Sequence, residues 1–411
     1  MATPTRAECV ALDAADTLGH LRGAFELPPD VVYLDGNSLG PPPVLARTRV
    51  EDLLRREWGE GLVRSWNDAG WIDAPRRVGE KIARLIGAAP GEVIVADSTS
   101  VSIFKLLAAA LELRPGRRVI LMREADFPTD GYIAQGLAAM TGAELRRTGV
   151  AGLENALDSD VAVLCVTHVD YRTGEMLDMP GLTAAAQRAG ALAMWDLCHS
   201  AGAVPLDLGA AGVDLAVGCG YKYLNGGPGA PAFCMVATRH HDRLRQPLWG
   251  WMGHASPFAF EADHRPAVGT ARLLSGTPPI LAIAALEAGV DTWAEVDMTA
   301  VRAKSLALAE LCMALVDVRC AGLGVEVVTP RAPARRGSQV SLRFADAYPL
   351  GRALIARGVI VDFRPPDILR VGLTPLYLRF VDVFDAVEVL AEVLVTEAWR
   401  QPEYAVRAAV T

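Results

Sequence analysis

The chain has 411 residues, of which 51% are hydrophobic and 21% are charged. This composition excludes an intrinsically disordered protein, because disorder requires low hydrophobicity and a high net charge. The 40 basic and 48 acidic side chains give a formal net charge of −8, and an acidic chain lacks the basic field that binds nucleic acid.

The region between about residues 66 and 275 alternates short apolar runs with helical patterns. Strands are predicted at 92–96, 118–122, 161–167, 191–196 and 214–218. Helices are predicted between them at 101–113, 132–140 and 183–189. This alternation predicts a mostly parallel sheet with helices on both faces. Because such sheets bind ligands at the carboxyl ends of their strands, the polar residues that follow each strand are candidate site residues.

The pattern changes after about residue 280. Residues 280–315 predict helix with an interruption near 291–297, and a last helix is expected at 381–397. Between them, short strands are predicted at 325–328, 340–344 and 359–362, with a helix at 350–357. This part of the chain reads as an α+β unit of its own. The fold class is therefore predicted to be α/β, with a large domain and a smaller α+β domain.

The cysteines, the N-terminus and the lengths of the apolar runs indicate the cellular compartment of the protein. Seven cysteines are widely spaced without any Cys-x-x-Cys pair, which argues against a disulfide framework and against a metal site. The N-terminus carries no apolar signal region, and no apolar run is long enough to span a bilayer. We therefore expect a cytoplasmic protein that does not contact a membrane.

Two polar segments follow the predicted strands and suggest a cofactor. Residues 97–100 (Asp-Ser-Thr-Ser) precede a helix, whose N-terminus suits a phosphate, although this segment taken alone favours an ordinary helix cap. Asp196 ends a strand and could pair with a protonated ring nitrogen, while His199 could orient the same ring. The alternatives are a helix cap for Asp196 and a buried core histidine for His199.

Lys222 is the third candidate. It lies between two tyrosines in a glycine-rich stretch after a strand, and no other lysine occurs between Lys105 and Lys304. A desolvated lysine can form a Schiff base with a carbonyl, whereas a lysine in a surface loop is the alternative. Phosphate-binding hydroxyls, an aspartate and a lysine in this order are the elements of pyridoxal phosphate (PLP) chemistry.

Several segments recur together in one known family. They are LDGNSLG (34–40), FPTD (127–130), DLCH (196–199), YKYLN (221–225), GWMGH (250–254), SGTPP (275–279) and RV with PLY (370–371, 375–377). On these segments, and over nearly its whole length, the chain resembles the kynureninases, within the fold type I, class V aminotransferase-like PLP enzymes. The resemblance implies a large PLP-binding domain (61–280) and a small domain (281–411) that residues 1–60 join. It also implies a homodimer with a shared active site.

The resemblance implies hydrolysis of L-kynurenine to anthranilate and L-alanine through a Schiff base, a quinonoid and cleavage of the Cβ–Cγ bond. Lys222 then holds PLP and moves protons, Asp196 partners the pyridinium nitrogen, and Arg370 clamps the substrate α-carboxylate. Further cofactor contacts are implied for Thr99, Ser100, Phe127, Asp130, Thr167, His199, Tyr221, Trp251 and Thr277, the last from a second subunit. Tyr221 is our hypothesis for the general acid/base at the γ-carbonyl.

A few residues suggest where the aryl group binds and which substrate is preferred. Trp66 and Trp71 are candidate walls for the aryl group, with core packing as the alternative for each. Relatives that prefer 3-hydroxykynurenine tend to carry Asn where this chain has Thr277, and a His near the Trp66 region. The departure favours L-kynurenine, with weaker action on 3-hydroxykynurenine.

Two other functions remain open at this point. A cysteine desulfurase or lyase of the same superfamily requires a nucleophilic cysteine on a mobile loop. Cys320 lies in about the right third of the chain, but its surroundings indicate the junction of a helix and a strand. A non-catalytic binding protein with the same fold would have lost the lysine or the aspartate, and both Lys222 and Asp196 are present.

Overall fold

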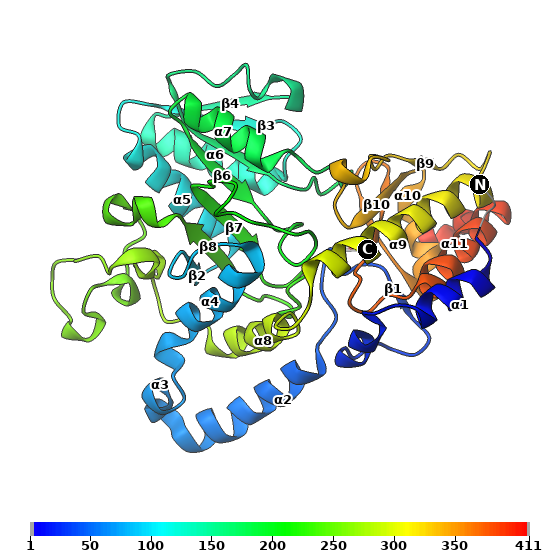
Figure 1. The fold of residues 1–411 in the computed structure, drawn as a ribbon, viewed down its shortest axis with the longest axis horizontal. Helices are drawn as coiled ribbons and strands as arrows, with labels where there is room; N and C mark the ends of the chain where they lie inside the picture. The colour runs from blue at the N-terminus through cyan, green and yellow to red at the C-terminus, as the bar shows by residue number, and fades with distance from the viewer. Residues whose placement is uncertain (1–3, 409–411) are drawn as a thin grey trace.

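The computed structural model describes residues 4–408, which form two lobes, each built around its own sheet (Figure 1). The larger lobe holds the middle of the chain, and both chain ends lie at the smaller lobe. None of the helices within residues 4–408 combines the length and the apolar character that crossing a membrane requires.

The large sheet has the strand order β2-β8-β7-β6-β5-β3-β4 in the described part of the chain. Strands β3 to β7 run parallel, and β8 is antiparallel to both of its neighbours. The strands are β2 (Val93–Val95), β3 (Val119–Arg123), β4 (Glu144–Thr148), β5 (Val161–Thr167), β6 (Leu192–Asp196), β7 (Leu215–Cys219) and β8 (Ala232–Val236). The five predicted strands and the α/β fold class are confirmed, whereas β4 and β8 were not predicted.

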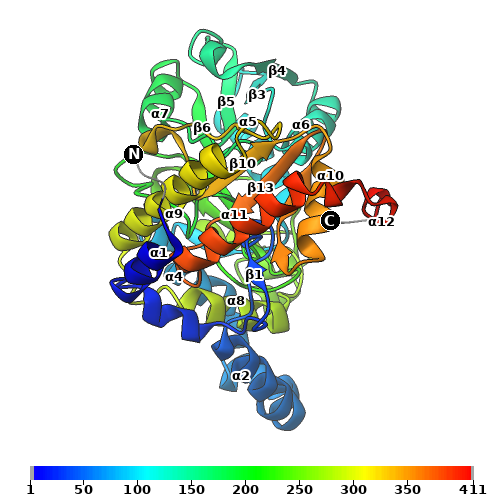
Figure 2. The same ribbon diagram turned by 90° about the vertical axis from the view of Figure 1, so that its right-hand side faces the viewer.

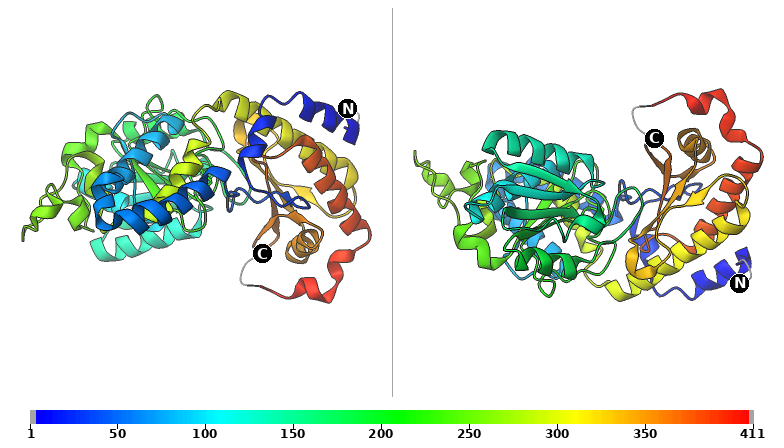
Figure 3. Two further views of the ribbon diagram at one scale, coloured as in Figure 1. Left: turned by 90° about the horizontal axis from the view of Figure 1, so that it is seen from below. Right: turned by 90° about the horizontal axis from the view of Figure 1, so that it is seen from above.

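Helices cover both faces of this sheet, as Figure 3 shows. The apolar side chains of α4 (Ala74–Ile86), α7 (Met179–Arg188) and α8 (Ile280–Asp291) pack on one face. Those of α5 (Thr99–Leu113) and α6 (Pro128–Thr141) pack on the other. Every residue of β5 is therefore buried, which explains why its sequence is a continuous apolar run rather than an alternating one.

The small lobe contains an antiparallel sheet in the order β12-β13-β10-β9. Helix α9 packs beside α11, and both lie across this sheet (Figure 2). Its elements are α9 (Met298–Arg319), β9 (Glu326–Val327), β10 (Gln339–Arg343), α10 (Ala347–Ile355), β11 (Val359–Ile360), β12 (Asp362–Arg364), β13 (Ile368–Gly372), α11 (Phe380–Val395) and α12 (Pro402–Ala405). Strand β13, which carries Arg370, was not predicted.

The N-terminal segment contacts both lobes. Helix α1 (Arg6–Ala14) packs on α11, and β1 (Val32–Tyr33) pairs in parallel with β11. Helix α2 (Val44–Asp52) instead packs on α8 and leads through a helical stretch to α3 (Ser65–Asp68), below the large lobe in Figure 1. Residues 44–60 thus lie with the large lobe rather than the small one, and the division at residues 60 and 280 stays a prediction.

Candidate active site

A cavity of about 110 Å³ lies at the carboxyl ends of the large-sheet strands. The turns after β2, β5, β6 and β7 and the start of α6 supply its walls. The structure brings together nine of the predicted site residues there: Thr99, Ser100, Phe127, Asp130, Thr167, Asp196, His199, Tyr221 and Lys222. The site therefore lies where a parallel sheet is expected to bind its ligand.

The Lys222 amine lies beside His199. Its Nζ is 3.0 Å from the imidazole Nε2. Burial lowers the pKa of His199 well below its usual value, and the charge of Lys222 lowers it further. The imidazole is therefore neutral near pH 7, and Nε2 can accept a hydrogen bond from the ammonium.

The turn that carries Lys222 is fixed by close backbone contacts. The Gly40 N–H donates to the Tyr221 carbonyl over 2.8 Å. A Cβ atom at Gly40 would lie 2.4 Å from the Lys222 carbonyl oxygen, so only glycine allows this approach. The N-terminal LDGNSLG segment thus supports the lysine turn from the side of the small lobe.

Two carboxyl groups lie on the opposite wall. The Asp196 side chain is buried and accepts a hydrogen bond from the Cys198 N–H over 2.7 Å. Burial raises the pKa of Asp130 well above its usual value, and the neighbouring charge of Asp196 raises it further. Burial and the neighbouring Asp196 thus both favour the neutral form of Asp130, which reduces the repulsion between the two carboxyl groups.

The turn after β2 forms the third wall. Helix α5 begins at Thr99, and the Ser98 hydroxyl caps it by accepting from the Val101 N–H. The first N–H groups of a helix have no partner within the helix, and they carry the positive end of its dipole. With the hydroxyls of Thr99 and Ser100 at this end, the turn can hold a phosphate.

Two buried polar atoms at this cavity have no hydrogen-bond partner within the described residues. They are the Thr167 hydroxyl oxygen and the Nδ1 atom of His199. Buried polar groups are normally paired, so both atoms indicate a polar ligand. A lysine for an aldehyde, a carboxylate for a ring nitrogen and a helix N-terminus for a phosphate together fit PLP.

Arg370 lies at the border of the site rather than in its wall. It is 2% exposed, and its Nε donates to Asp362 Oδ1 over 2.6 Å while Nη2 donates to the other carboxylate oxygen. Its Nη1 donates to the Tyr171 carbonyl over 2.8 Å. Because Tyr171 lines the cavity, this bond ties the arginine of the small sheet to the site in the large lobe.

Besides Arg370, three predicted site residues are not among those that line the cavity. Trp66 lies edge-on against Trp71, with ring centroids 5.8 Å apart, and Trp71 packs in a small apolar cluster. Trp251 is 38% exposed and lies edge-on against Phe258, and Thr277 is also exposed. Nothing within the same described chain brings them to Lys222.

Some cavity residues were not predicted from the sequence. Thr129, Tyr171 and Cys198 all line it. The Tyr171 ring lies edge-on to Phe127, with centroids 5.2 Å apart, and its carbonyl holds Arg370. Tyr171 follows the end of β5 by four residues, so the rule that ligands bind after strand ends could have identified it.

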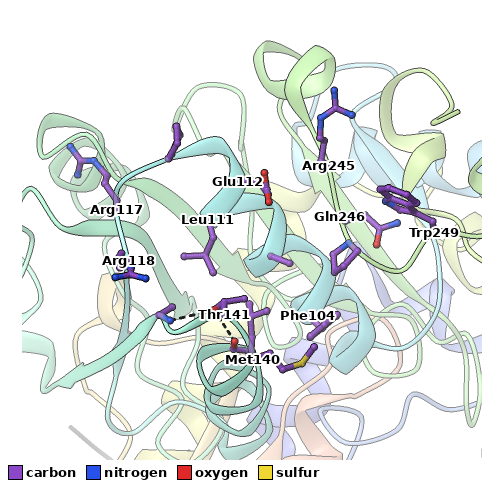
Figure 4. A pocket seen from close by; sticks show the side chains of 15 residues that line it. Phe104, Leu111, Glu112, Arg117, Arg118, Met140, Thr141, Arg245, Gln246 and Trp249 are labelled. Atoms are coloured by element: carbon purple, nitrogen blue, oxygen red, sulfur yellow. Dashed lines mark hydrogen bonds between the residues drawn. The ribbon is translucent and has the colours of Figure 1, made fainter. Parts of the chain in front are cut away.

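A larger cavity lies elsewhere. It measures about 590 Å³ and lies between α5, α6 and the stretch 245–249 (Figure 4). Within the described residues, its lining includes none of the predicted site residues. We place the active site in the smaller cavity, because the charged and orphaned polar groups converge there.

Cys320 does not lie at either cavity. It caps the end of α9, is 3% exposed and belongs to the apolar core of the small lobe. Burial raises the pKa of its thiol to about 11. A buried and protonated thiol is a poor nucleophile, which removes the structural basis for a desulfurase reaction at this residue.

Comparison with known proteins assigns the chain to a family. A kynureninase of Burkholderia pseudomallei is 54% identical over 414 aligned positions, which cover 99% of this chain and 100% of that relative. The chain belongs to the kynureninase family. The family described as "Kynureninase C-terminal domain" matches residues 301–390.

Solved structures agree with the fold. A cysteine desulfurase of Escherichia coli superposes with a TM-score of 0.78 at 19% identity, covering 92% of this chain and 99% of that one. A cystine C–S lyase, solved with glycine linked covalently to its PLP cofactor, gives a TM-score of 0.77 at 17% identity over 95% and 100% of the two chains. These similarities support fold type I, which is the fold expected for this kynureninase-family chain.

Proposed function

We propose that the chain is a PLP-dependent kynureninase, which hydrolyses L-kynurenine to anthranilate and L-alanine. The observation that carries this proposal is the convergence of Lys222, Asp196 and the Thr99–Ser100 turn on one cavity in a chain of the kynureninase family. The enzyme adds water to the substrate carbonyl and breaks the neighbouring carbon–carbon bond.

Different cavity residues would contact different parts of the cofactor. Lys222 would hold the aldehyde carbon, Asp196 the ring nitrogen, and the hydroxyls of Thr99 and Ser100 the phosphate. Thr167 would donate to the ring hydroxyl, which gives its orphaned oxygen a partner. Phe127 and His199 would lie against the ring, and Asp196 would face the ring nitrogen with Asp130, whose pKa is raised by burial, beside it. Bound PLP supplies an electron sink for the negative charge that develops at the substrate α-carbon.

Lys222 is positioned for proton transfer. Its amine would take the α-proton of the substrate, and the neutral His199 imidazole would hold that amine by a hydrogen bond. The partial burial of Tyr221 raises the pKa of its phenol. Tyr221 therefore keeps its proton near pH 7 and can donate it to the γ-carbonyl oxygen as water adds.

The substrate carboxylate and aryl group need further contacts. Arg370 would clamp the α-carboxylate, because a guanidinium matches a carboxylate with two parallel hydrogen bonds. Trp66 would contact the aryl group. Thr277 favours L-kynurenine, so we expect 3-hydroxykynurenine to be turned over more weakly.

We further propose a cytoplasmic homodimer in which each subunit completes the partner's site. Trp66, Trp251 and Thr277 lie away from the cavity of their own chain, and a second copy would bring them to it. Large apolar side chains near Trp251 support a buried interface: Phe258 is 61% exposed and Phe260 is 78% exposed. All seven cysteines are free, as expected for a reducing compartment.

The decisive experiment combines an absorbance spectrum with product detection. The purified protein with PLP should show a visible aldimine band and release fluorescent anthranilate from L-kynurenine. The Lys222→Ala variant should lose both. If the intact, PLP-loaded protein released no anthranilate, the proposed reaction would be wrong.

The shared site is tested by mixing two inactive variants. Lys222→Ala and Trp251→Ala damage the same site from different subunits if the proposal is correct. Unfolding and refolding them together should restore roughly a quarter of the wild-type activity, because mixed dimers contain one intact site. If the mixture stayed inactive although mixed dimers formed, Trp251 would act within its own subunit.

A further inference from the structure

Lys105 is a buried charge that the proposed reaction does not use. It lies on α5 and is 0% exposed. An ammonium group has three N–H donors, and each has a partner here. They donate to the Asp97 carboxylate over 2.5 Å, to the Leu273 carbonyl over 2.6 Å and to the Ser275 hydroxyl over 2.8 Å. Burying a charged group costs free energy, so the buried Lys105 ammonium is expected to have a structural or functional role.

One partner of Lys105 belongs to the phosphate side of the cavity. Asp97 lies two residues after the end of β2 and adopts a positive φ of 49°, just before Ser98 and the start of α5. Its carboxylate therefore lies two residues before Thr99. An unpaired carboxylate at this position would repel a phosphate dianion, and the Lys105 ammonium neutralises it.

The other partners belong to the segments that we propose to contact the second subunit. Ser275 lies two residues before Thr277, and its hydroxyl donates to the Leu248 carbonyl over 2.8 Å. The Met252 N–H donates to the Ser275 carbonyl over 3.2 Å. A Cβ at Gly250 would lie 2.2 Å from the same oxygen, so the two segments touch through their backbones. In Figure 4, Gln246 and Trp249, which precede Gly250 in the chain, line the same cavity as Phe104, the neighbour of Lys105 on α5.

We propose that Lys105 is a positioning residue for the cofactor phosphate. It holds the Asp97–Ser100 turn in its own site, and it holds the segments of Trp251 and Thr277 that reach the partner's site. It also cancels the Asp97 charge. This inference rests on the proposed function, because it requires that these segments bind the phosphate of PLP.

The test measures cofactor affinity rather than turnover. The full chain is stripped of cofactor and titrated with PLP and, separately, with pyridoxal, which lacks the phosphate. The Lys105→Met variant should bind PLP at least about tenfold more weakly, because it leaves the partly exposed Asp97 carboxylate without its ion-pair partner, next to the place of the phosphate. Its affinity for pyridoxal should change by less than about twofold, because the effect acts through the phosphate.

Lys304→Met is the matched control. Lys304 is also a buried lysine, paired over 2.6 Å with Asp16 and with the Pro375 carbonyl, but it lies in the small lobe. The Lys304→Met variant should have a lower melting temperature, but its affinity for PLP should not fall relative to its affinity for pyridoxal. The double variant Asp97→Asn/Lys105→Met removes both charges and should recover part of the lost affinity.

Three results would overturn the inference. They are an unchanged PLP affinity in Lys105→Met, an equal loss for PLP and pyridoxal, and no recovery in the double variant. If Lys105→Met does not fold, Ser275→Ala removes one partner of the ammonium, and it should weaken PLP binding about threefold with pyridoxal unaffected. If Ser275→Ala bound PLP with the affinity of the wild-type chain, the inference would be overturned as well. A wild-type chain that binds no PLP would instead refute the proposed function.

Discussion

Asp362 orients the Arg370 guanidinium. Replacing Asp362 with asparagine should therefore weaken the binding of substrate to Arg370. Both side chains are buried, and the carboxylate accepts from Nε and Nη2 of the guanidinium. With Nη1 donating to the Tyr171 carbonyl, three of the five N–H donors of arginine are used. One N–H on each terminal nitrogen is left to bind a carboxylate end-on.

The size of the effect follows from the hydrogen bonds that asparagine cannot make. The asparagine side chain has one acceptor oxygen in place of the two carboxylate oxygens. Its NH₂ group would face an N–H of Arg370, and the negative charge of the carboxylate would be lost. Breaking a buried ion pair costs about 3–5 kcal/mol, and the remaining bond places Asp362→Asn at the lower end. That figure is a free energy of unfolding; if the same about 3 kcal/mol is lost from the contact of Arg370 with the substrate, kcat/KM falls by roughly 150-fold, since about 1.4 kcal/mol is tenfold.

The loss should appear mainly in KM, because Arg370 would hold the α-carboxylate equally before and during the reaction. Anthranilate release at saturating PLP measures both constants. Glu326→Gln is the control, because Glu326 forms an exposed ion pair with Arg343 over 2.8 Å in the same sheet, and such pairs contribute little. A KM within twofold of wild type, with a lowered melting temperature, would show that Asp362 only stabilises the fold and would refute this reasoning.

Three further predictions concern single side chains. Tyr221→Phe should lower kcat by about 10²–10⁴-fold without loss of PLP absorbance, and an unchanged kcat would remove Tyr221 as the acid. Burial, and then the charge of Asp362, raise the pKa of Asp35 to about 8. Its contribution to stability is therefore present at low pH and is lost as the pH rises through about 8. Asp35→Asn should make urea unfolding less sensitive to pH between about 4 and 8, and an identical pH dependence would contradict this. Cys320→Ala should keep full turnover in the anthranilate assay, whereas a large loss would favour a cysteine nucleophile.

The sequence predicts the large sheet well because its strands are buried on both faces. Continuous apolar runs such as β5 have few alternative interpretations. Edge strand β4 (ELRRT) is mostly charged and only partly buried, so its side chains give no strand signal. Strand β13 carries the buried Arg370 in its centre, and a charged residue interrupts the apolar pattern that would otherwise mark it.

The candidate site is predictable where residues follow strand ends, since topology alone brings Asp196, Thr167 and Lys222 to one edge. Residues that depend on long-range packing are not predictable in this way. Tyr171 holds Arg370 through a backbone carbonyl, which no side-chain pattern reveals. The pairing of Lys105 with the 273–275 segment depends on contacts about 170 positions apart. A role for Trp66, Trp251 and Thr277 at the site rests on the proposed homodimer, because all three lie away from the cavity of their own chain.

The lysines of this protein allow its active sites to be counted directly. The chain contains four, Lys81, Lys105, Lys222 and Lys304. Lys105 and Lys304 are buried in ion pairs, and Lys81 pairs with Glu287 and Asp291 over 2.9 and 2.6 Å. Only Lys222 lines the cavity. Borohydride treatment without added PLP should therefore fix one label per loaded chain, at Lys222, and intact mass would give the loaded fraction of a preparation without an activity standard.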